Sequence, residues 1–228
     1  MPPTIVFDLD GTLVDTAEDL VATLNAILVG EGMVPVSVEK LMAMVGSGAR
    51  VMLEAAFAAE GRALTGEKLD RLLRAFLALY DVHLADRSKP YPGAEAALDR
   101  FAADGWRLAV CTNKYEAPAR KLLGILGLAG RFAAITGQDT FAFKKPDPRH
   151  LTETIRLACG SPENAIMVGD SRTDIDTAIA AGIRVVAVTF GYSPLPVAGL
   201  GATKVIDRLD QLYEAVAAIR QPAAARPA

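Results

Sequence analysis

Residues 5–15 of the chain are Ile5-Val6-Phe7-Asp8-Leu9-Asp10-Gly11-Thr12-Leu13-Val14-Asp15. The apolar and partly β-branched run from Thr4 to Leu9 predicts a short buried strand. Ligands of open α/β sheets bind beyond the carboxyl ends of the strands, so Asp8 and Asp10 lie where a reaction is expected. Gly11 would let the backbone turn sharply directly after them.

The side chains of Asp8 and Asp10 repel each other unless a positive charge lies between them. Mg²⁺ is the natural candidate, because it prefers a few hard oxygen ligands and keeps several of its waters. With a metal ion present, one aspartate could attack a substrate and the other could move protons. The alternative is a strand that ends in a solvated Asp turn, and the Asp-x-Asp pair alone does not decide between the two.

Length and composition restrict the class of protein. At about 150 residues per domain, 228 residues predict one domain with an insertion, or two small domains. Hydrophobic residues make up 51% of the chain and charged residues 22%, which is typical of a globular protein with a large core. The net charge of −3 gives no support for binding to nucleic acid or to a membrane surface, and no apolar run is long enough to span a bilayer. The N-terminus lacks the pattern of a signal peptide, so we expect a cytoplasmic protein.

Cysteine and histidine give little support for other kinds of site. Cys111 and Cys159 form no C-x-x-C pair, and we expect both to be small buried side chains rather than reactive thiols. His83 and His150 are isolated in the sequence, so a zinc site or a serine triad has little to build on.

After the first strand, the chain shows helical patterns as far as residue 84. Residues 16–28, 37–44, 51–60 and 66–84 predict helices, with a flexible break at residues 45–50. The clearest is the last, whose apolar side chains line one face: Leu69, Leu72, Leu73, Phe76, Leu77, Tyr80 and Leu84. Such a stripe usually belongs to a core. This pattern predicts a helical insertion in an α/β domain.

From residue 85 onward, strand and helix patterns alternate. Residues 107–111, 132–136, 164–169, 184–189 and 203–206 predict strands, and the alternation implies parallel pairing with right-handed crossovers. We therefore expect residues 1–15 and 85–228 to form a Rossmann-like α/β core, and residues 16–84 to form a second, all-helical domain. The Pro/Ala-rich tail, residues 221–228, is expected to be disordered.

Four places at strand ends or in loops carry polar side chains. They are Asp8 with Asp10, Thr112 with Asn113, Lys145, and Asp170 with Asp174. Each has an ordinary alternative: Thr112 and Asp170 could cap helices, Lys145 could be a solvated surface residue, and Asp174 could be an acid favoured in the first turn of a helix. Together they fit one site, because three carboxylates are hard oxygen ligands, while a hydroxyl and a lysine supply what a transferred phosphoryl group needs.

On these motifs the chain resembles the haloacid dehalogenase-like hydrolases over essentially its whole length. The resemblance rests on four segments in order: Asp8-Leu9-Asp10-Gly11-Thr12-Leu13-Val14-Asp15, Thr112-Asn113-Lys114, Lys145-Pro146, and Gly169-Asp170-Ser171-Arg172-Thr173-Asp174. It implies a Rossmann-like parallel sheet with a helical cap inserted after the first segment. The insertion at residues 16–84 was expected from the helical patterns as well.

The resemblance implies roles for the acidic residues. Asp8 would be the nucleophile and form an aspartyl-phosphate. Asp10 would protonate the leaving oxygen and then activate water. Asp8, Asp170 and the backbone carbonyl of Asp10 would hold Mg²⁺, with Asp174 in support and Gly11 in the turn. The second acid favours phosphoryl transfer over dehalogenation, because a departing halide needs no proton.

The resemblance also implies how a substrate is held. Thr112 and the backbone of Asn113 would bind phosphoryl oxygens, and Lys145 would neutralise charge on the nucleophile and the phosphate. Within the family, the segments around Lys114, Lys145-Pro146-Asp147-Pro148, Thr189-Phe190-Gly191-Tyr192 and Gly46-Ser47-Gly48-Ala49-Arg50 look most like the phosphoglycolate phosphatases. We expect Arg50 or Lys114 to meet the substrate carboxylate, and glycines such as Gly48 to let the cap loop approach closely. The alternative for Arg50 is a solvated residue at the start of a helix.

Other functions stay open at this point. A pyrophosphatase or another small-phosphomonoester phosphatase would use the same core chemistry, and a phosphomutase would use the same two aspartates. A receiver-like module that holds its phosphate belongs to a different class, and the large insertion and the Asp-x-Asp spacing disfavour it. The expected partner is a small phosphorylated molecule, with no nucleic acid and no membrane, and the expected state is a monomer or homodimer.

Overall fold

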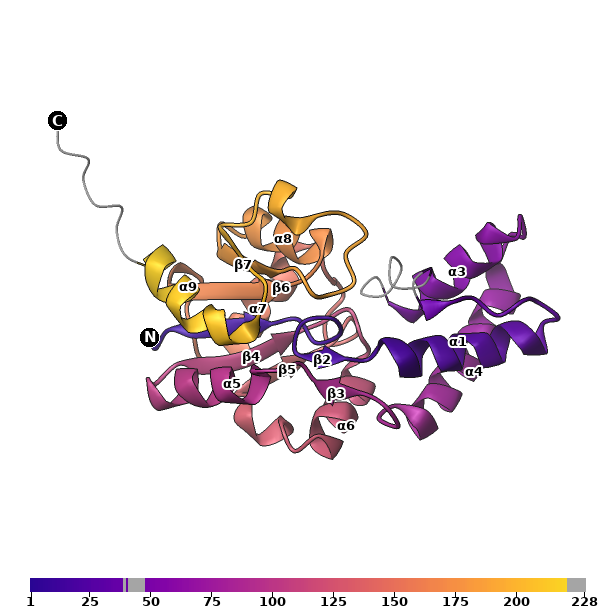
Figure 1. Ribbon diagram of the computed structural model, residues 1–228, viewed down its shortest axis with the longest axis horizontal. Coiled ribbons are helices and arrows are strands. Elements are labelled where there is room, and N and C mark those ends of the chain that lie inside the picture. Colours follow the sequence, from indigo (N-terminus) through magenta and orange to yellow (C-terminus); the bar gives the residue numbers. More distant parts are fainter. Residues whose placement is uncertain (39, 41–47, 221–228) are drawn as a thin grey trace.

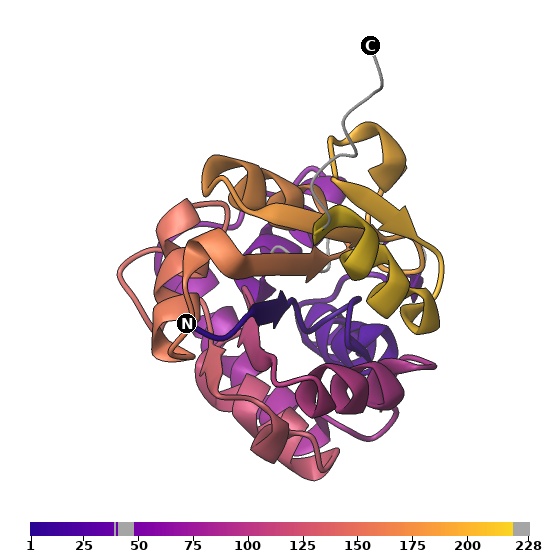
Figure 2. The same ribbon diagram turned by 90° about the vertical axis from the view of Figure 1, so that its left-hand side faces the viewer.

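The centre of the fold is a parallel sheet of six strands (Figures 1 and 2). The computed structural model describes residues 1–38, 40 and 48–220. The strand order is β5-β4-β1-β6-β7-β8. The strands are β1 (Thr4–Phe7), β4 (Arg107–Cys111), β5 (Ala134–Thr136), β6 (Ala165–Gly169), β7 (Arg184–Val188) and β8 (Lys204–Ile206). The predicted α/β fold with a parallel sheet is confirmed.

Strand β1 lies in the middle because both of its faces are apolar. All four of its residues are buried, and it pairs in parallel with β4 on one side and β6 on the other. Ile5 and Phe7 point into one core cluster, and Val6 points into the other. Continuous apolar runs of this kind are typical of parallel strands that are covered on both faces.

Helices cover the two faces of the sheet. The first core cluster joins side chains of α5 (Ala94–Ala103), α6 (Glu116–Ile125) and α9 (Leu212–Arg220) to one face. The second joins α7 (Pro148–Leu157) and α8 (Arg172–Ala180) to the other. Helices between the strands agree with the predicted alternation of strand and helix patterns from residue 85 onward. None of the described helices is long and apolar enough to cross a membrane.

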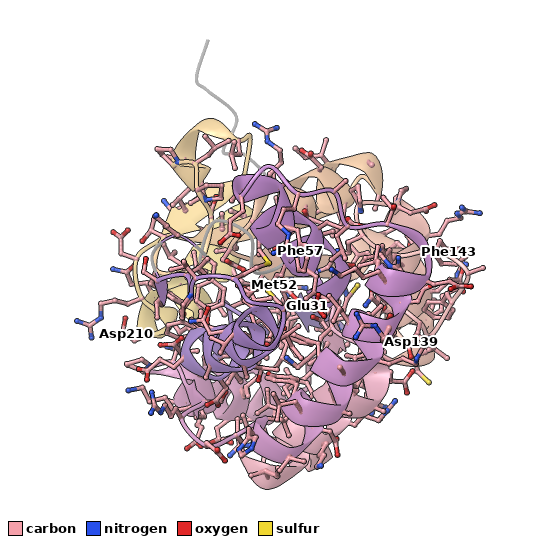
Figure 3. All side chains as sticks on the ribbon, turned by 90° about the vertical axis from the view of Figure 1, so that its right-hand side faces the viewer. Glu31, Met52, Phe57, Asp139, Phe143 and Asp210 are labelled. Carbon is pink, nitrogen blue, oxygen red and sulfur yellow. The ribbon has the colours of Figure 1, made fainter. Side chains whose placement is uncertain are left out.

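A second group of helices lies beside the sheet and is joined to it by two chain crossings (Figure 1). This helical group consists of α1 (Ala17–Gly30), α3 (Ala49–Ala59) and α4 (Gly66–His83). Its interior is apolar: Met52 and Phe57, both on α3, are almost fully buried (Figure 3). On its outer side, Glu31 forms ion pairs with Lys68 and Arg71. The helix predicted over residues 37–44 lies mostly outside the described residues, and the tail at 221–228 lies wholly outside them.

The two crossings between the sheet and the helical group are paired with each other. Strand β2 (Val14–Asp15) leaves the sheet side and pairs in antiparallel fashion with β3 (Lys89–Pro90) on the return. We call this pair the hinge ribbon. Close by, the Asp19 carboxylate of α1 accepts hydrogen bonds from the Arg87 and Ser88 backbone N–H groups and from the Ser88 hydroxyl. Exit and return are thus held together by a strand pair that is not among the predicted strands.

Candidate active site

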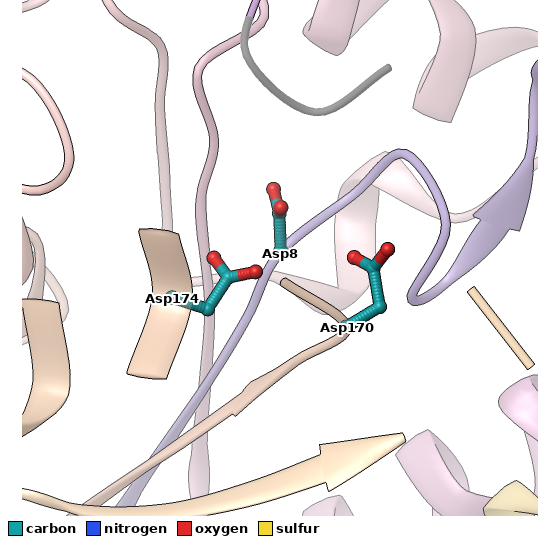
Figure 4. A group of neighbouring side chains, drawn as sticks. All are labelled: Asp8, Asp170 and Asp174. Carbon is teal, nitrogen blue, oxygen red and sulfur yellow. The ribbon is translucent and has the colours of Figure 1, made fainter. Parts of the chain in front are cut away.

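The four predicted motifs meet at the carboxyl ends of β1, β4 and β6. Asp8 follows β1, Thr112 follows β4 and Asp170 follows β6, and these three strands are neighbours in the sheet. Asp174 joins them from the first turn of α8. Figure 4 shows the carboxylates of Asp8, Asp170 and Asp174 turned toward a common space. A parallel sheet produces this convergence, because all of its strands end at the same edge.

The three carboxylates form a buried acidic cluster. One oxygen from each of Asp8, Asp170 and Asp174 lies within 4.8 Å of the other two, and the residues are at most 2% exposed. Burial, followed by the negative charge of Asp174, raises the pKa of Asp8 well above its usual range, and the same two causes raise the pKa of Asp170 to about 7. The protein therefore gathers more negative charge here than its own groups compensate.

This donor set fits Mg²⁺. Mg²⁺ prefers carboxylate and carbonyl oxygens and keeps several of its waters. The excess negative charge of the three carboxylates favours a divalent cation. The fit extends to Asp174, which the sequence placed only in a supporting role. The Asp10 side chain, by contrast, is not part of the acidic cluster, so a contribution from Asp10 through its backbone carbonyl stays a prediction.

Lys145 is the cation of the acidic cluster. Its Nζ lies 2.5 Å from Asp174 Oδ1 and 3.1 Å from Asp8 Oδ1, and the residue is 1% exposed. Burial alone would lower the pKa of Lys145, but the carboxylates of Asp174 and Asp8 outweigh it and raise the pKa above its ordinary value. The Lys145 backbone N–H donates to His150 Nδ1, which fixes the loop before α7. The surface alternative for Lys145 is thereby excluded.

Asp174 also has the structural role that was its alternative. It forms a capping box with Ser171 at the start of α8: the Asp174 backbone N–H donates to Ser171 Oγ, and the Ser171 backbone N–H donates to Asp174 Oδ2. Its other oxygen, Oδ1, accepts from Lys145. One carboxylate thus orders the helix and positions the lysine.

Asp10 has a separate set of partners. Its Oδ1 accepts hydrogen bonds from the Thr16 hydroxyl at 2.8 Å and from Lys114 Nζ at 2.9 Å. Lys114 Nζ also donates to the Tyr80 hydroxyl, 2.8 Å away on α4 of the helical group. Burial raises the pKa of Tyr80 to about 12, because it outweighs the nearby Lys114 ammonium, which acts in the opposite direction. Asp10 is therefore held by groups from both sides of the hinge ribbon.

Thr112 and Asn113 connect the neighbouring loops. Thr112 Oγ1 accepts from the backbone N–H of Lys114, and Asn113 Nδ2 donates to the backbone carbonyl of Lys145. Asn113 Oδ1 is buried and has no hydrogen-bond partner among the residues that the structure describes. These contacts order the loop whose hydroxyl and N–H groups the sequence assigned to phosphate.

A small cavity lies between the sheet and the helical group. Its polar wall holds Asp8, Asp10, Thr112, Asn113 and Lys114. Its opposite wall is mostly apolar and holds Leu20, Gly48, Ala49, Met52, Phe76, Leu77 and Tyr80. The cavity is partly open, and its volume of about 30 Å³ suffices for two or three water molecules.

Gly48 and Arg50 have different places in this arrangement. Gly48 adopts φ +92° and ψ 159°, and a Cβ there would lie 3.3 Å from the carbonyl oxygen of Asn113. The expected close approach of a glycine is thus seen at Gly48. Arg50, in the first turn of α3, pairs with Asp70 at 2.8 Å on a half-exposed surface and does not line the cavity formed by the described residues. Arg50 is thus a solvated residue at the start of a helix, which was the alternative interpretation of its sequence position.

Two residues around Asp10 were not predicted from the sequence. Tyr80 was assigned to the apolar stripe of α4, and its hydroxyl offered the only signal, since a buried hydroxyl needs a partner. Thr16 was placed at the start of a helix, where threonine is common, and nothing nearby in the sequence points to Asp10.

Comparison with known proteins agrees with this site. The model of the haloacid dehalogenase-like hydrolase family matches residues 5–188. A phosphoglycolate phosphatase of Mesorhizobium japonicum is 54% identical over 210 residues, which cover 92% of each chain. Another from Agrobacterium fabrum is 46% identical and covers 95% of this chain and 93% of its own. The crystal structure of a predicted phosphoglycolate phosphatase from Haemophilus somnus has a TM-score of 0.87 at 29% identity and covers 93% of this chain and 97% of its own.

These matches extend over the motifs on which the resemblance was based. The family match begins within β1 and ends with β7, so it contains Asp8, Thr112, Lys145 and Asp170. The relatives are named phosphatases, which confirms the predicted enzyme class. The chain belongs to the haloacid dehalogenase-like hydrolase family.

Proposed function

We propose that this protein is a Mg²⁺-dependent phosphatase that hydrolyses 2-phosphoglycolate through an aspartyl-phosphate on Asp8. The observation that carries the proposal is the division of partners between two nearby acids. Asp8 lies against Lys145 in the acidic cluster, whereas Asp10 lies against Thr16 and Lys114. Two carboxylates in different environments suit a nucleophile and a proton carrier. The names of the relatives support the choice of substrate.

The first step transfers the phosphoryl group to the enzyme. A carboxylate oxygen of Asp8 forms a bond to phosphorus, and the bond from phosphorus to the glycolate oxygen breaks. Asp10 gives its proton to the departing oxygen, so glycolate leaves as an alcohol. Lys145 lies within reach of Asp8 and offsets charge on the nucleophile and on the phosphoryl oxygens.

The second step restores the enzyme. Water attacks the phosphorus of the aspartyl-phosphate, Asp10 takes a proton from that water, and the bond between phosphorus and Asp8 breaks to release phosphate. Thr112 and the backbone N–H of Asn113 hold phosphoryl oxygens through both steps. Asp8, Asp170 and the Asp10 carbonyl would hold Mg²⁺, with Asp174 in support. When bound, the ion supplies positive charge to the carboxylates and the phosphoryl group.

Lys114 is the residue that we assign to the substrate carboxylate. An ammonium group has three hydrogen-bond donors, and Lys114 directs them to Asp10 Oδ1 at 2.9 Å, Asp10 Oδ2 at 3.2 Å and the Tyr80 hydroxyl. A substrate carboxylate in the cavity, which Lys114 lines and Arg50 does not, would take the place of the longer contact with Asp10 Oδ2. The mostly apolar opposite wall disfavours pyrophosphate, because a second phosphoryl group would need more donors than the described residues of this wall offer.

The helical group acts as a cap over the site. It supplies the apolar wall of the cavity, and its two connections meet in the hinge ribbon. Outward movement admits the substrate, and inward movement excludes water while the phosphoryl group is transferred. The domain division at residues 15/16 and 84/85 stays a prediction; β2 ends at Asp15, and β3 begins at Lys89. The predicted cytoplasmic location and the monomeric or homodimeric state stay predictions.

The decisive experiment measures phosphate release from 2-phosphoglycolate, sugar phosphates, a nucleoside monophosphate and pyrophosphate. Each substrate is tested with Mg²⁺ and with EDTA, using wild type, D8N and D210N. Asp210 is an exposed aspartate that pairs with Arg208, so its replacement controls for the loss of a carboxylate (Figure 3). We expect metal-dependent turnover with the highest kcat/KM on 2-phosphoglycolate, unchanged in D210N and lowered at least about 10³-fold in D8N.

Other outcomes separate the alternatives. A higher kcat/KM on pyrophosphate or on a sugar phosphate would contradict 2-phosphoglycolate as the substrate and leave the proposed mechanism unchanged. Stoichiometric retention of phosphate without turnover would indicate a receiver-like module. Full activity of D8N would contradict a nucleophilic Asp8.

A further inference from the structure

Tyr192 connects the acidic cluster to the start of the helical group. It lies in the loop after β7, is 3% exposed, and its backbone N–H donates to Asp170 Oδ2 at 2.7 Å. Two glycines allow this approach: a Cβ on Gly191 would lie 2.2 Å from Asp170 Cβ, and one on Gly11 would lie 2.6 Å from Asp170 Oδ2. The loop is therefore packed directly against a residue of the proposed metal site.

The hydroxyl of Tyr192 reaches the segment where the chain leaves the sheet. It donates to Asp15 Oδ1 at 2.8 Å, and it accepts the backbone N–H groups of Thr16 at 2.7 Å and Ala17 at 3.0 Å. A phenol has one donor and room for two acceptor contacts, so these partners use its full capacity. A single oxygen atom thus holds the junction between the hinge ribbon and α1.

These contacts fix the residue whose side chain holds Asp10. A threonine at an N-cap usually accepts from the backbone N–H of the second or third helical residue. Thr16 occupies the N-cap of α1 and makes no such bond, and its hydroxyl donates to Asp10 Oδ1. The Tyr192 hydroxyl accepts from the backbone N–H of Thr16 itself, and it shares the N–H of Ala17 with Asp15 Oδ1, which lies 3.3 Å away. Without the Tyr192 hydroxyl, the Thr16 backbone loses this anchor, and its side chain can turn to the ordinary capping position, away from Asp10.

We propose that Tyr192 is a positioning residue for Asp10: its hydroxyl fixes the start of α1 and thereby leaves the Thr16 hydroxyl on the Asp10 carboxylate. The inference rests on the proposed function, in which Asp10 protonates the leaving oxygen. It adds a residue outside the four motifs and gives the segment Thr189-Phe190-Gly191-Tyr192 a role in the reaction.

The test uses Y192F, which removes one oxygen atom and keeps the ring and the backbone N–H. The readout is kcat/KM on 2-phosphoglycolate and on p-nitrophenyl phosphate, whose leaving group departs without a proton. General acid catalysis contributes about 10²–10⁴-fold, so a misplaced Asp10 should cost roughly 10- to 100-fold on 2-phosphoglycolate and little on the aryl ester. A change that merely loosened the structure would lower both values equally, and that result, or no loss at all, would overturn the inference.

Three further variants locate the effect. T16V should show the same preference for the aryl ester, T16S should retain activity, and Y192F added to T16V should cost less than about 3-fold more, because both changes act on one contact. Additive losses, or a T16V variant without the preference, would overturn the coupling. Y213F is the matched control, since the Tyr213 hydroxyl bonds to Asp104 on an exposed surface.

A readout without turnover completes the test. Calorimetric titration should give the same Mg²⁺ affinity for Y192F and wild type, because the backbone N–H on Asp170 is kept, and a thermal melt shows that the variant is folded. Weakened Mg²⁺ binding in Y192F would place its effect on the metal site and overturn a role through Thr16. Wild type that is inactive on both esters would instead refute the proposed function, so the two failures are distinguishable.

Discussion

At the scale of single residues, Lys114 and Arg50 show why the cation that binds the substrate carboxylate is hard to identify from sequence. Both lie near motifs, and both carry a positive charge. The difference is in their partners: Lys114 is 8% exposed and lines the cavity, whereas Arg50 is neutralised by Asp70 at the surface. A local sequence pattern cannot reveal that ion pair, because Asp70 lies 20 residues away on another helix.

We therefore predict that K114M loses preference for carboxylated substrates. With the ammonium removed, KM for 2-phosphoglycolate should rise at least about 10-fold more than KM for ethyl phosphate, which lacks the carboxylate. Because Lys114 also holds Asp10, kcat should fall on both substrates. Steady-state kinetics on the two esters separate these effects.

R50A is the matched variant for this prediction. Exposed ion pairs contribute about 0–1 kcal/mol to the free energy of unfolding, so R50A should fold normally. Because Arg50 does not line the cavity that the described residues form, both KM values should stay within roughly 3-fold of wild type. A selective rise of KM for 2-phosphoglycolate in R50A, with none in K114M, would mean that Arg50 binds the substrate carboxylate.

The core residues of the site were predictable for a physical reason. Asp8, Thr112, Lys145 and Asp170 follow strands or open helices, and parallel strands bring such positions to one edge. Tyr80 and Tyr192 were not predicted, because each acts through a hydroxyl whose partner is distant in sequence: Tyr192 and Asp15 are 177 positions apart. Thr16 lies only six positions from Asp10, but a threonine at the start of a helix is common and does not indicate that contact.

At the scale of elements, the helices and strands with clear periodicity were predictable, and the hinge ribbon was not. Strands β2 and β3 have two residues each, and a pattern of period two cannot be recognised over two residues. Pro90 further weakens a strand interpretation, because proline cannot donate to a ladder. The ribbon exists because Val14 and Pro90 lie on segments that leave and re-enter the sheet at the same place.

The start of α3 supplies the prediction at this scale. Gly48 has a φ of +92° with extended ψ, a conformation that essentially only glycine adopts, and other residues pay about 1–3 kcal/mol there. The Cβ of G48A would also press on the Asn113 carbonyl at 3.3 Å and approach Gln138 Oε1 at 3.5 Å. Because both neighbours belong to the sheet side, the closed position of the helical group should be destabilised.

We expect G48A to lower kcat/KM on 2-phosphoglycolate roughly 10-fold or more while lowering the melting temperature by only a few degrees, as closure is a small part of the folding energy. G61A is a useful control, because Gly61 also has a positive φ, +68°, but its Cβ would meet nothing within 4 Å. Equal losses of activity in the two variants would attribute the effect to backbone strain and not to the contact with the sheet side.

At the scale of the whole molecule, the acidic cluster is a compromise between folding and function. It gathers Asp8, Asp170 and Asp174 from segments up to 166 positions apart, and Lys145 supplies one positive charge against three carboxylates. Folding without metal therefore works against electrostatic repulsion. Mg²⁺ that binds the folded chain and not the unfolded one should stabilise it by about 2.7 kcal/mol at 100 times its dissociation constant.

For a chain of this length, that free energy corresponds to a rise in melting temperature of about 5–10 °C. We expect D170N to remove this response to Mg²⁺ and yet to melt at a higher temperature than wild type in EDTA, because one of the repelling charges is gone. The asparagine keeps both contacts of Asp170, since its carbonyl oxygen can accept from the Tyr192 N–H and its amide can donate to the Thr12 hydroxyl. D176N, an exposed change on α8, should behave as wild type. Thermal melts of the three proteins with Mg²⁺ and with EDTA test this prediction. If D170N melts at a lower temperature than wild type in EDTA, Asp170 stabilises the fold by itself. The acidic cluster would then not need a cation to offset its charge.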